Sequence, residues 1–158
     1  NIGRENARTI LKGVVSKKDF DILMSATYFK GAEAEAFVNK HKKLRIGRHA
    51  SVLLCNRVKR RVWQHAINAY PNIVNAPTSV QKAILAQCVL SGAGSERLRP
   101  IGVAISTGNW MGVADLIATI RSDMIGGPFE RIWRDDQKMA NIIKLSLNLP
   151  KNLRKDYD

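Results

Sequence analysis

The segment that most constrains the fold of this chain is residues 49–70. Its apolar residues recur every fourth position, as they do along one face of an α-helix. That face carries Leu54, Val58, Val62, Ala66 and Tyr70. Arg57, Arg60 and Gln64 fall largely on the other faces, and Pro71 ends the pattern because the residue before a proline is disfavoured in a helix. The sequence therefore predicts a long amphipathic helix that stops at Tyr70.

Helical patterns also occupy most of the remaining chain. We predict further helices over residues 5–11, 79–90, 98–106, 110–121 and 129–147. Ser79 and Asn109 are suitable N-cap residues, because their side-chain oxygens can accept from free backbone N–H groups in the first turn. Residues 83–90 are apolar on nearly all sides, with Gln87 the only polar member, so we expect a central buried helix there. Core packing is also our interpretation of Trp63, Trp110 and Trp133.

Residues 14–38 show no clear periodicity. β-Branched and aromatic residues are mixed with the helix-favouring run at positions 31–37, so the strand signal is weak. We expect at most a small irregular hairpin in this segment, followed by a basic linker over residues 40–47. The predicted fold class is therefore mainly α, with some α+β character contributed by that hairpin.

Composition narrows the other possibilities. A chain of 158 residues is long enough for one domain with a substantial core, and no apolar run reaches the length of a membrane span. Cys55 and Cys88 lie in apolar helical patterns, so we expect buried thiols rather than a disulfide or a metal site. The three histidines lack the compact spacing of metal ligands, and we expect neither a metal nor another cofactor.

Charge is the strongest compositional signal. The formal net charge is +13, and no Asp or Glu occurs between Glu35 and Glu96. Such a surface attracts an anionic cell-wall polymer, nucleic acid or an acidic protein, although a solvated basic face would have the same composition. The residues predicted to bind a polyanion are Lys40, Lys42, Lys43, Arg45, Arg48, Arg57, Lys59, Arg60 and Arg61.

A separate pattern lies near the N-terminus. Lys12, which precedes a glycine, is followed by Asp21 and Thr27, ahead of Gly31. This order and spacing resemble phage-type lysozymes (glycoside hydrolase family 24), in which Glu-Gly, Asp and Thr precede a glycine-rich hairpin. The resemblance covers most of the chain at low identity. Further matching segments are residues 49–58, 70–72, 79–85, 108–110 and 126–127.

The resemblance implies a single lysozyme-like domain over residues 1–158. Residues 1–48 would form a small N-terminal lobe, residues 49–70 a linking helix and residues 71–150 a helical lobe. A loose tail is expected over residues 151–158, because that segment is polar and follows a proline.

Departures from the family pattern bear on catalysis. Hydrolysis of a glycosidic bond needs an acid to protonate the leaving oxygen, and the family uses the glutamate at the position of Lys12. Asp21 and Thr27 retain the positions of the stabilising carboxylate and of the water-orienting hydroxyl. Lysine, with a reference pKa near 10.4, is a reluctant proton donor at neutral pH, and its charge opposes an oxocarbenium-like transition state. Lys12 could equally form a salt bridge with Asp21.

These observations predict a lysozyme-fold protein that has lost its catalytic activity. We expect a structural component of a phage virion or tail, or a protein that binds peptidoglycan without cutting it. The alternatives are an active muramidase that uses Asp21 with an unconventional acid, such as Glu33 or Glu35, and a basic nucleic-acid-binding protein. Expected partners are peptidoglycan, other phage structural proteins or nucleic acid, with no membrane span. The expected location is the virion or the host periplasm and cell wall, after synthesis in the cytoplasm. The chain begins at Asn1 without a methionine or a secretory leader, which we interpret as a processed or shortened product.

Overall fold

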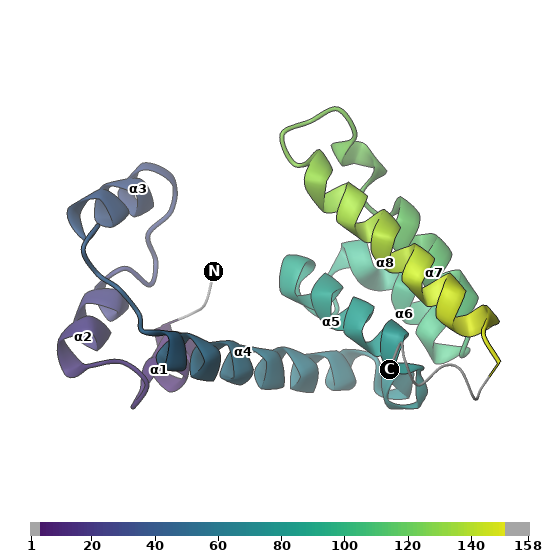
Figure 1. The fold of residues 1–158 in the computed structure, drawn as a ribbon, viewed down its shortest axis with the longest axis horizontal. Helices are drawn as coiled ribbons and strands as arrows, with labels where there is room; N and C mark the ends of the chain where they lie inside the picture. The colour runs from purple at the N-terminus through teal and green to yellow at the C-terminus, as the bar shows by residue number, and fades with distance from the viewer. Residues whose placement is uncertain (1–3, 151–158) are drawn as a thin grey trace. The chain divides into compact units, whose positions relative to one another are not determined.

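The computed structural model describes residues 4–150 (Figure 1). Within that range every regular element is an α-helix or a 3-10 helix, and no strand forms, which confirms the prediction of a mainly helical chain. The chain divides into two compact units, Asn1–Arg60 and Arg61–Asp158, referred to below as the N-terminal and C-terminal units. The expected loose tail, residues 151–158, lies outside the described residues.

The N-terminal unit contains α1, α2, α3 and the first part of α4. The predicted helix over residues 5–11 is confirmed by α1 (Arg4–Leu11), which packs against α2 (Lys17–Ser25). α3 (Gly31–Lys40) follows after a short turn. The small irregular hairpin predicted for residues 14–38 is wrong, since α2 and α3 occupy that segment.

Local sequence explains why this segment is helical. The Ser16 hydroxyl oxygen accepts a hydrogen bond from the backbone N–H of Asp19 at 3.1 Å, which caps the start of α2. Gly31 adopts φ +51°, a backbone conformation that glycine enters at little cost, and the alanine- and glutamate-rich run that follows has high helix propensity. These local preferences outweigh the scattered β-branched residues that suggested a hairpin.

α4 (Arg48–Ala69) confirms the long helix predicted over residues 49–70. It begins one residue earlier and ends one residue earlier than expected. The division between the two compact units falls inside this helix, between Arg60 and Arg61. Ala66 and Tyr70 of the predicted apolar face are buried, whereas Leu54 and Val58 are only half-buried.

The C-terminal unit is built from the end of α4 and a set of shorter helices. All of the α-helices predicted for this part are present, with three 3-10 turns between them. The elements are η1 (Pro71–Asn75), α5 (Thr78–Ser91), η2 (Glu96–Leu98), α6 (Arg99–Ser106), α7 (Trp110–Thr119), η3 (Ser122–Met124) and α8 (Glu130–Asn148).

The core of this unit lies between α5, α7 and α8. α7 and α8 run side by side over most of their length (Figure 1). Ile84 of α5, Val113 of α7 and Ile143 of α8 are buried in one apolar cluster. Trp63 and Trp110 pack against this cluster, as their spacing predicted, whereas Trp133 is half-buried and does not belong to it. α5 is buried on one side only, because Val89 and Leu90 at its end are 57% and 49% exposed, so the expectation of a helix enclosed on nearly all sides is wrong.

A polar network is enclosed beside the apolar core. The Arg121 guanidinium donates a hydrogen bond to Asp136 Oδ2 at 2.7 Å and another to Ser91 Oγ at 2.7 Å. The same guanidinium donates to the Gln87 side-chain oxygen, and Gln87 Nε2 donates to Asp136 Oδ1 at 2.7 Å. Arg121 is 2% exposed, and both Asp136 and Gln87 are 0% exposed. The network therefore links α5, the end of α7 and α8 through charges that have no access to water.

The two cysteines, both expected to be buried, differ in their exposure. Cys88 is buried, and burial raises the pKa of its thiol to about 11. Cys55 is exposed, as are its helix neighbours Val52 and Leu53, so the prediction that both thiols are buried is wrong for Cys55. Across residues 4–150, none of the helices combines the length and apolarity needed to cross a membrane.

Candidate functional site

The predicted catalytic positions all lie in the N-terminal unit. Lys12 follows the last residue of α1, and its backbone N–H donates to the Arg8 carbonyl at 3.0 Å, which continues the helical hydrogen bonding. Its carbonyl accepts from Arg57 Nη1 at 2.7 Å. The side chain is exposed. Lys12 thus contributes its backbone to the end of α1 and presents its ammonium group to solvent.

Asp21 lies within α2, and Thr27 lies two residues after the end of that helix. Asp21 is an exposed residue of α2. Thr27 follows α2, and its hydroxyl donates to the Met24 carbonyl at 3.0 Å, so the hydroxyl hydrogen is used locally. Among residues 4–150, no hydrogen bond or ion pair connects Lys12 with Asp21, or either of them with Thr27. The expected alternative of a Lys12–Asp21 salt bridge is therefore wrong.

The nearby glutamates do not supply a buried acid. Glu33 and Glu35 are both exposed residues of α3, as expected for a solvated helix face. General acid catalysis at neutral pH uses a carboxyl group whose pKa is raised by burial or by a neighbouring charge. Both glutamate side chains are open to solvent.

Most of the predicted polyanion-binding residues are exposed. The N-terminal unit contains 14 Lys and Arg against 5 Asp and Glu, whereas residues 61–158 contain 12 against 8. The exposed cations lie at the end of α3, in the loop after it and on α4. They are Lys40, Lys42, Lys43, Arg45, Arg48, Arg57, Lys59 and Arg60, whereas Arg61 is half-buried. The Arg45 guanidinium also folds back on its own loop and donates to the Leu44 carbonyl at 3.0 Å.

Arg57 has a structural role that its sequence context did not indicate. Its Nη1 donates to the carbonyls of Ile10 at 2.9 Å and Lys12 at 2.7 Å, and more weakly to that of Thr9 at 3.4 Å. The carbonyls of Thr9 and Ile10 belong to the last turn of α1 and that of Lys12 follows it, at the end of the helix where backbone donors run out and the helix dipole favours a cation. Arg57 therefore joins α4 to α1 and is less available to a ligand than the other cations.

An aromatic hollow of about 400 Å³ opens between the end of α2 and α3. We define it by five lining residues: Phe29, Glu33, Phe37, Lys40 and His41. The centroid of the Phe37 ring lies 5.8 Å from that of Phe29, with an edge-on interplanar angle of 70°. On its other side the Phe37 ring lies 4.6 Å from the His41 ring at 42°. Sequence reasoning missed this hollow, although the i, i+4 spacing of Phe37 and His41 would have placed their rings together on a helix.

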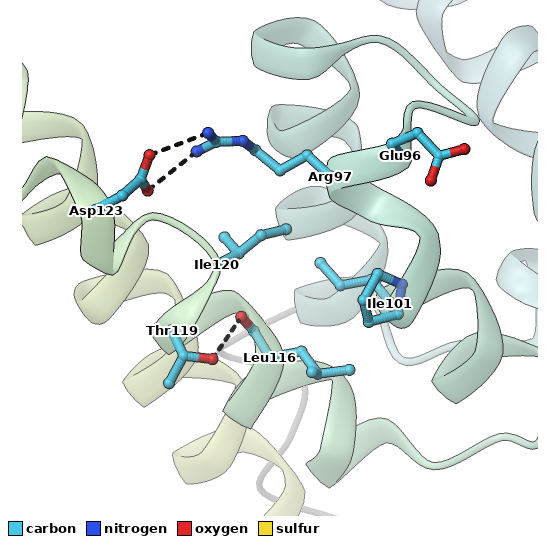
Figure 2. Close-up of a pocket in the computed structure, with 8 residues that line it drawn as sticks. Glu96, Arg97, Ile101, Leu116, Thr119, Ile120 and Asp123 are labelled. Carbon is cyan, nitrogen blue, oxygen red and sulfur yellow. Dashed lines mark hydrogen bonds and ion pairs between the residues drawn. The ribbon is translucent and has the colours of Figure 1, made fainter.

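A second pocket, of about 730 Å³, lies in the C-terminal unit (Figure 2). Ile101, Leu116 and Ile120 form its apolar wall. Arg97 donates to both carboxylate oxygens of Asp123, at 3.1 and 3.3 Å, and these hydrogen bonds lower the pKa of Asp123. The pair joins η2 to η3 at the pocket, and both side chains remain substantially exposed. The pocket contains none of the residues that the sequence singled out.

The geometry gives no indication of a metal centre. Within residues 4–150, nowhere do three or more His, Cys, Asp or Glu side chains gather closely enough to hold an ion. Comparison with known proteins adds no assignment, because no protein-family model, curated protein or solved structure shows a significant match to this chain.

Proposed function

We propose that this protein is a catalytically inactive relative of the phage-type lysozymes that binds peptidoglycan without hydrolysing it. The observation that carries the binding function is the excess of exposed cations in the N-terminal unit. Peptidoglycan carries carboxylates on its stem peptides, so an exposed cationic surface complements its charge. By the same sequence resemblance, we propose that the protein acts as a component of a phage virion or tail.

The absence of catalysis follows from the groups at the positions of the lysozyme pattern. The acid is replaced by Lys12, whose side chain is exposed, and an alkylammonium group is a poor proton donor at neutral pH. Asp21 is exposed, and the Thr27 hydroxyl hydrogen is directed to a backbone carbonyl. Protonation of the leaving group therefore has no donor, and this step accounts for a large part of the rate in glycosidases.

Co-sedimentation with purified, insoluble peptidoglycan tests the binding function. We expect the full chain to pellet with the polymer at low ionic strength and to be progressively released as salt is added, because exposed charge pairs are screened. The variant Lys42→Gln/Lys43→Gln should bind more weakly. Arg131→Gln/Lys138→Gln, which removes two exposed cations of α8, is the matched control and should bind like the natural chain. Failure of the natural chain to pellet at any salt concentration contradicts the proposal.

Nucleic-acid binding is the second candidate, and a different observation favours it. α4 contains no acidic residue, and three consecutive cations, Lys59, Arg60 and Arg61, lie within it. A basic helix of this kind can contact phosphates along a duplex, with an affinity that falls steeply with salt. Fluorescence anisotropy with a labelled DNA duplex distinguishes the two candidates. Binding to the duplex that is tighter than binding to peptidoglycan at the same ionic strength favours the second.

A further inference from the structure

We propose that two copies of this chain form a dimer through their C-terminal units. In this dimer each copy inserts the turn between η3 and α8, residues 125–129, into the 730 Å³ pocket of the other copy. We call these two surfaces the exposed turn and the C-terminal pocket. Both lie outside the basic N-terminal unit, so the dimer is independent of any binding to peptidoglycan or nucleic acid.

The exposed turn holds two large apolar side chains in solvent. Ile125 at its start is 55% exposed, and Phe129 at its end is 62% exposed. Hydrogen bonds fix the backbone between them. The Gly126 N–H donates to the Glu130 carboxylate at 3.0 Å, and the Glu130 N–H donates to the Gly127 carbonyl at 3.1 Å. Because the turn is already ordered, it loses little conformational entropy when its side chains enter a pocket.

The C-terminal pocket has an apolar wall that matches those side chains. Ile101 is 1% exposed, and the half-buried residues Leu116 and Ile120 complete the wall (Figure 2). The volume of about 730 Å³ is large enough for a phenylalanine and an isoleucine side chain together. None of the lining residues is aromatic, so a sugar or a nucleobase would find no ring on which to stack. Apolar protein side chains therefore suit the pocket better than a carbohydrate or a nucleotide.

The charge around these two surfaces identifies a second copy as the partner. Residues 96–136 contain six Asp and Glu against five Arg and no Lys, whereas the whole chain has a net charge of +13. Three ion pairs cancel charges at the surface of this segment: Arg97–Asp123, Arg99–Glu96 and Arg134–Glu130. Two strongly basic chains repel each other, so they meet at the lowest electrostatic cost where the local charge is near zero. A polyanion, by contrast, is attracted to the cations of the N-terminal unit.

The positions of the turn and the pocket favour a closed dimer. Asp123 lines the pocket, and Ile125 begins the turn only two residues later. Because the two surfaces adjoin each other, a two-fold axis allows both copies to insert their turns at once, and the same contact forms twice. The surface that becomes buried is small compared with that of a permanent dimer. We therefore expect a weak dimer, with a dissociation constant on the order of 10–100 μM.

Sedimentation velocity of the full chain tests the dimer. The concentration is varied from about 5 to 500 μM, which brackets the expected dissociation constant. A reductant is present so that exposed Cys55 forms no disulfide between copies. We expect a monomer at the lowest concentration and a dimer at the highest. Raising the salt concentration should strengthen the dimer, because salt screens the repulsion between the two copies, whereas it weakens binding to a polyanion.

One variant of each surface locates the contact. Phe129→Ala removes the larger side chain of the turn, and Thr119→Arg fills the pocket from an exposed position of α7. Each should weaken the dimer at least about tenfold, because a symmetric dimer loses the contact twice. The matched controls are Leu145→Ala, which removes an exposed apolar side chain of α8, and Ser106→Arg, which adds the same charge to an exposed position of α6. Neither control residue lines the pocket, and both variants should stay within about twofold of the natural chain.

Nuclear magnetic resonance identifies the contact directly in the natural chain. Isotopically labelled and unlabelled copies are mixed at the highest concentration, and nuclear Overhauser effects between copies are recorded. We expect them between the Phe129 ring of one copy and the methyl groups of Leu116 and Ile120 of the other. Urea midpoints, followed by tryptophan fluorescence, verify that all four variants are folded.

Four results would overturn the proposed dimer. The first is a chain that stays monomeric up to the highest concentration. The second is a dimer that both Phe129→Ala and Thr119→Arg leave intact, which would place the interface elsewhere. The third is a dimer that only Phe129→Ala weakens, because the turn would then not occupy the pocket. The fourth is a monomeric chain that binds the apolar dye anilinonaphthalene sulfonate and loses that binding in Thr119→Arg, since the pocket would then be a small-molecule site.

Discussion

Replacing Asp136 with alanine should be among the most destabilising single changes in the C-terminal unit. Arg121 is 2% exposed, and its guanidinium lies 2.7 Å from the Asp136 carboxylate. Without that carboxylate, the guanidinium stays buried with only the neutral partners Gln87 and Ser91. Removing one member of a buried ion pair costs about 3–5 kcal/mol, mostly because a charge is left uncompensated. We therefore expect Asp136→Ala to lower the free energy of unfolding by about 4 kcal/mol.

Urea unfolding followed by tryptophan fluorescence measures this loss of stability in the C-terminal unit. The chain has three tryptophans, Trp63, Trp110 and Trp133, and all of them lie within Arg61–Asp158. The signal therefore reports unfolding of the C-terminal unit. With a urea dependence of about 2 kcal/mol per molar, a loss of about 4 kcal/mol shifts the midpoint down by about 2 M.

The neighbouring residue provides the control. Asp135→Ala removes the same charge from the same helix, but the Asp135 side chain is 51% exposed, and its ion pair with Lys138, at 3.3 Å, lies at the surface. Its loss should change the free energy of unfolding by less than about 1 kcal/mol. The double variant Arg121→Met/Asp136→Leu, which removes both charges, should recover much of the stability lost in Asp136→Ala. The reasoning is refuted if Asp136→Ala and Asp135→Ala unfold at the same urea concentration, or if the double variant is less stable than Asp136→Ala.

Three further predictions concern other parts of the chain. Arg57→Ala should accelerate amide hydrogen exchange in α1, with a loss of about 1–2 kcal/mol of local protection, because three carbonyls lose their donor. Arg60→Ala should leave exchange in α1 unchanged, and equal acceleration by the two variants would contradict the capping role of Arg57. Asn109→Ala should lower the free energy of unfolding, followed by tryptophan fluorescence, by about 1 kcal/mol, because the Asn109 side-chain oxygen accepts a hydrogen bond from the Gly112 N–H at 2.9 Å at the start of α7. An unchanged urea midpoint would rule out a stabilising role for that cap. A thiol-specific disulfide reagent at mildly alkaline pH should react rapidly only with exposed Cys55, because Cys88 is buried and its raised pKa, about 11, keeps it in the unreactive thiol form. Rapid reaction of two thiols in the native protein would contradict the burial of Cys88.

The helices of the C-terminal unit could be predicted because local and long-range signals agree there. The apolar positions of residues 79–90 and 129–147 recur at helical spacing, and part of them, including Ile84 and Ile143, form the core, whereas others, such as Phe129, are exposed. Asn109 caps α7 as predicted. The N-cap predicted at Ser79 is wrong, because Ser79 lies inside α5, whose N-cap is Pro77, and its hydroxyl pairs with that of Ser146 at 2.6 Å. Where pattern, cap and burial all point to one structure, sequence reasoning is sufficient.

The N-terminal unit was harder to predict because its helices bury little. α3 contains no buried residue, so no apolar face marks its period in the sequence. The hairpin expectation gave weight to β-branched residues that are too scattered to form a strand. Helix propensity and the Ser16 cap decide the local structure instead.

Site prediction from sequence was limited by the same lack of a tertiary framework. Exposure of the cations follows from charge alone, whereas the capping role of Arg57 depends on a contact between residues more than forty positions apart. The buried pairing of Arg121 with Asp136 likewise joins different helices. Nothing in the sequence alone distinguishes Arg57 and Arg121 from the exposed arginines of this basic chain.

The central claim, binding to peptidoglycan without hydrolysis, is tested most directly by one assay on the natural chain. Purified, insoluble peptidoglycan is incubated with the protein at low ionic strength, and both the pelleted protein and the soluble sugar reducing ends are quantified. The account predicts that the protein pellets with the polymer and that reducing ends stay at the level of a protein-free sample. Release of soluble fragments that Asp21→Asn abolishes would contradict it, because the chain would then be an active muramidase.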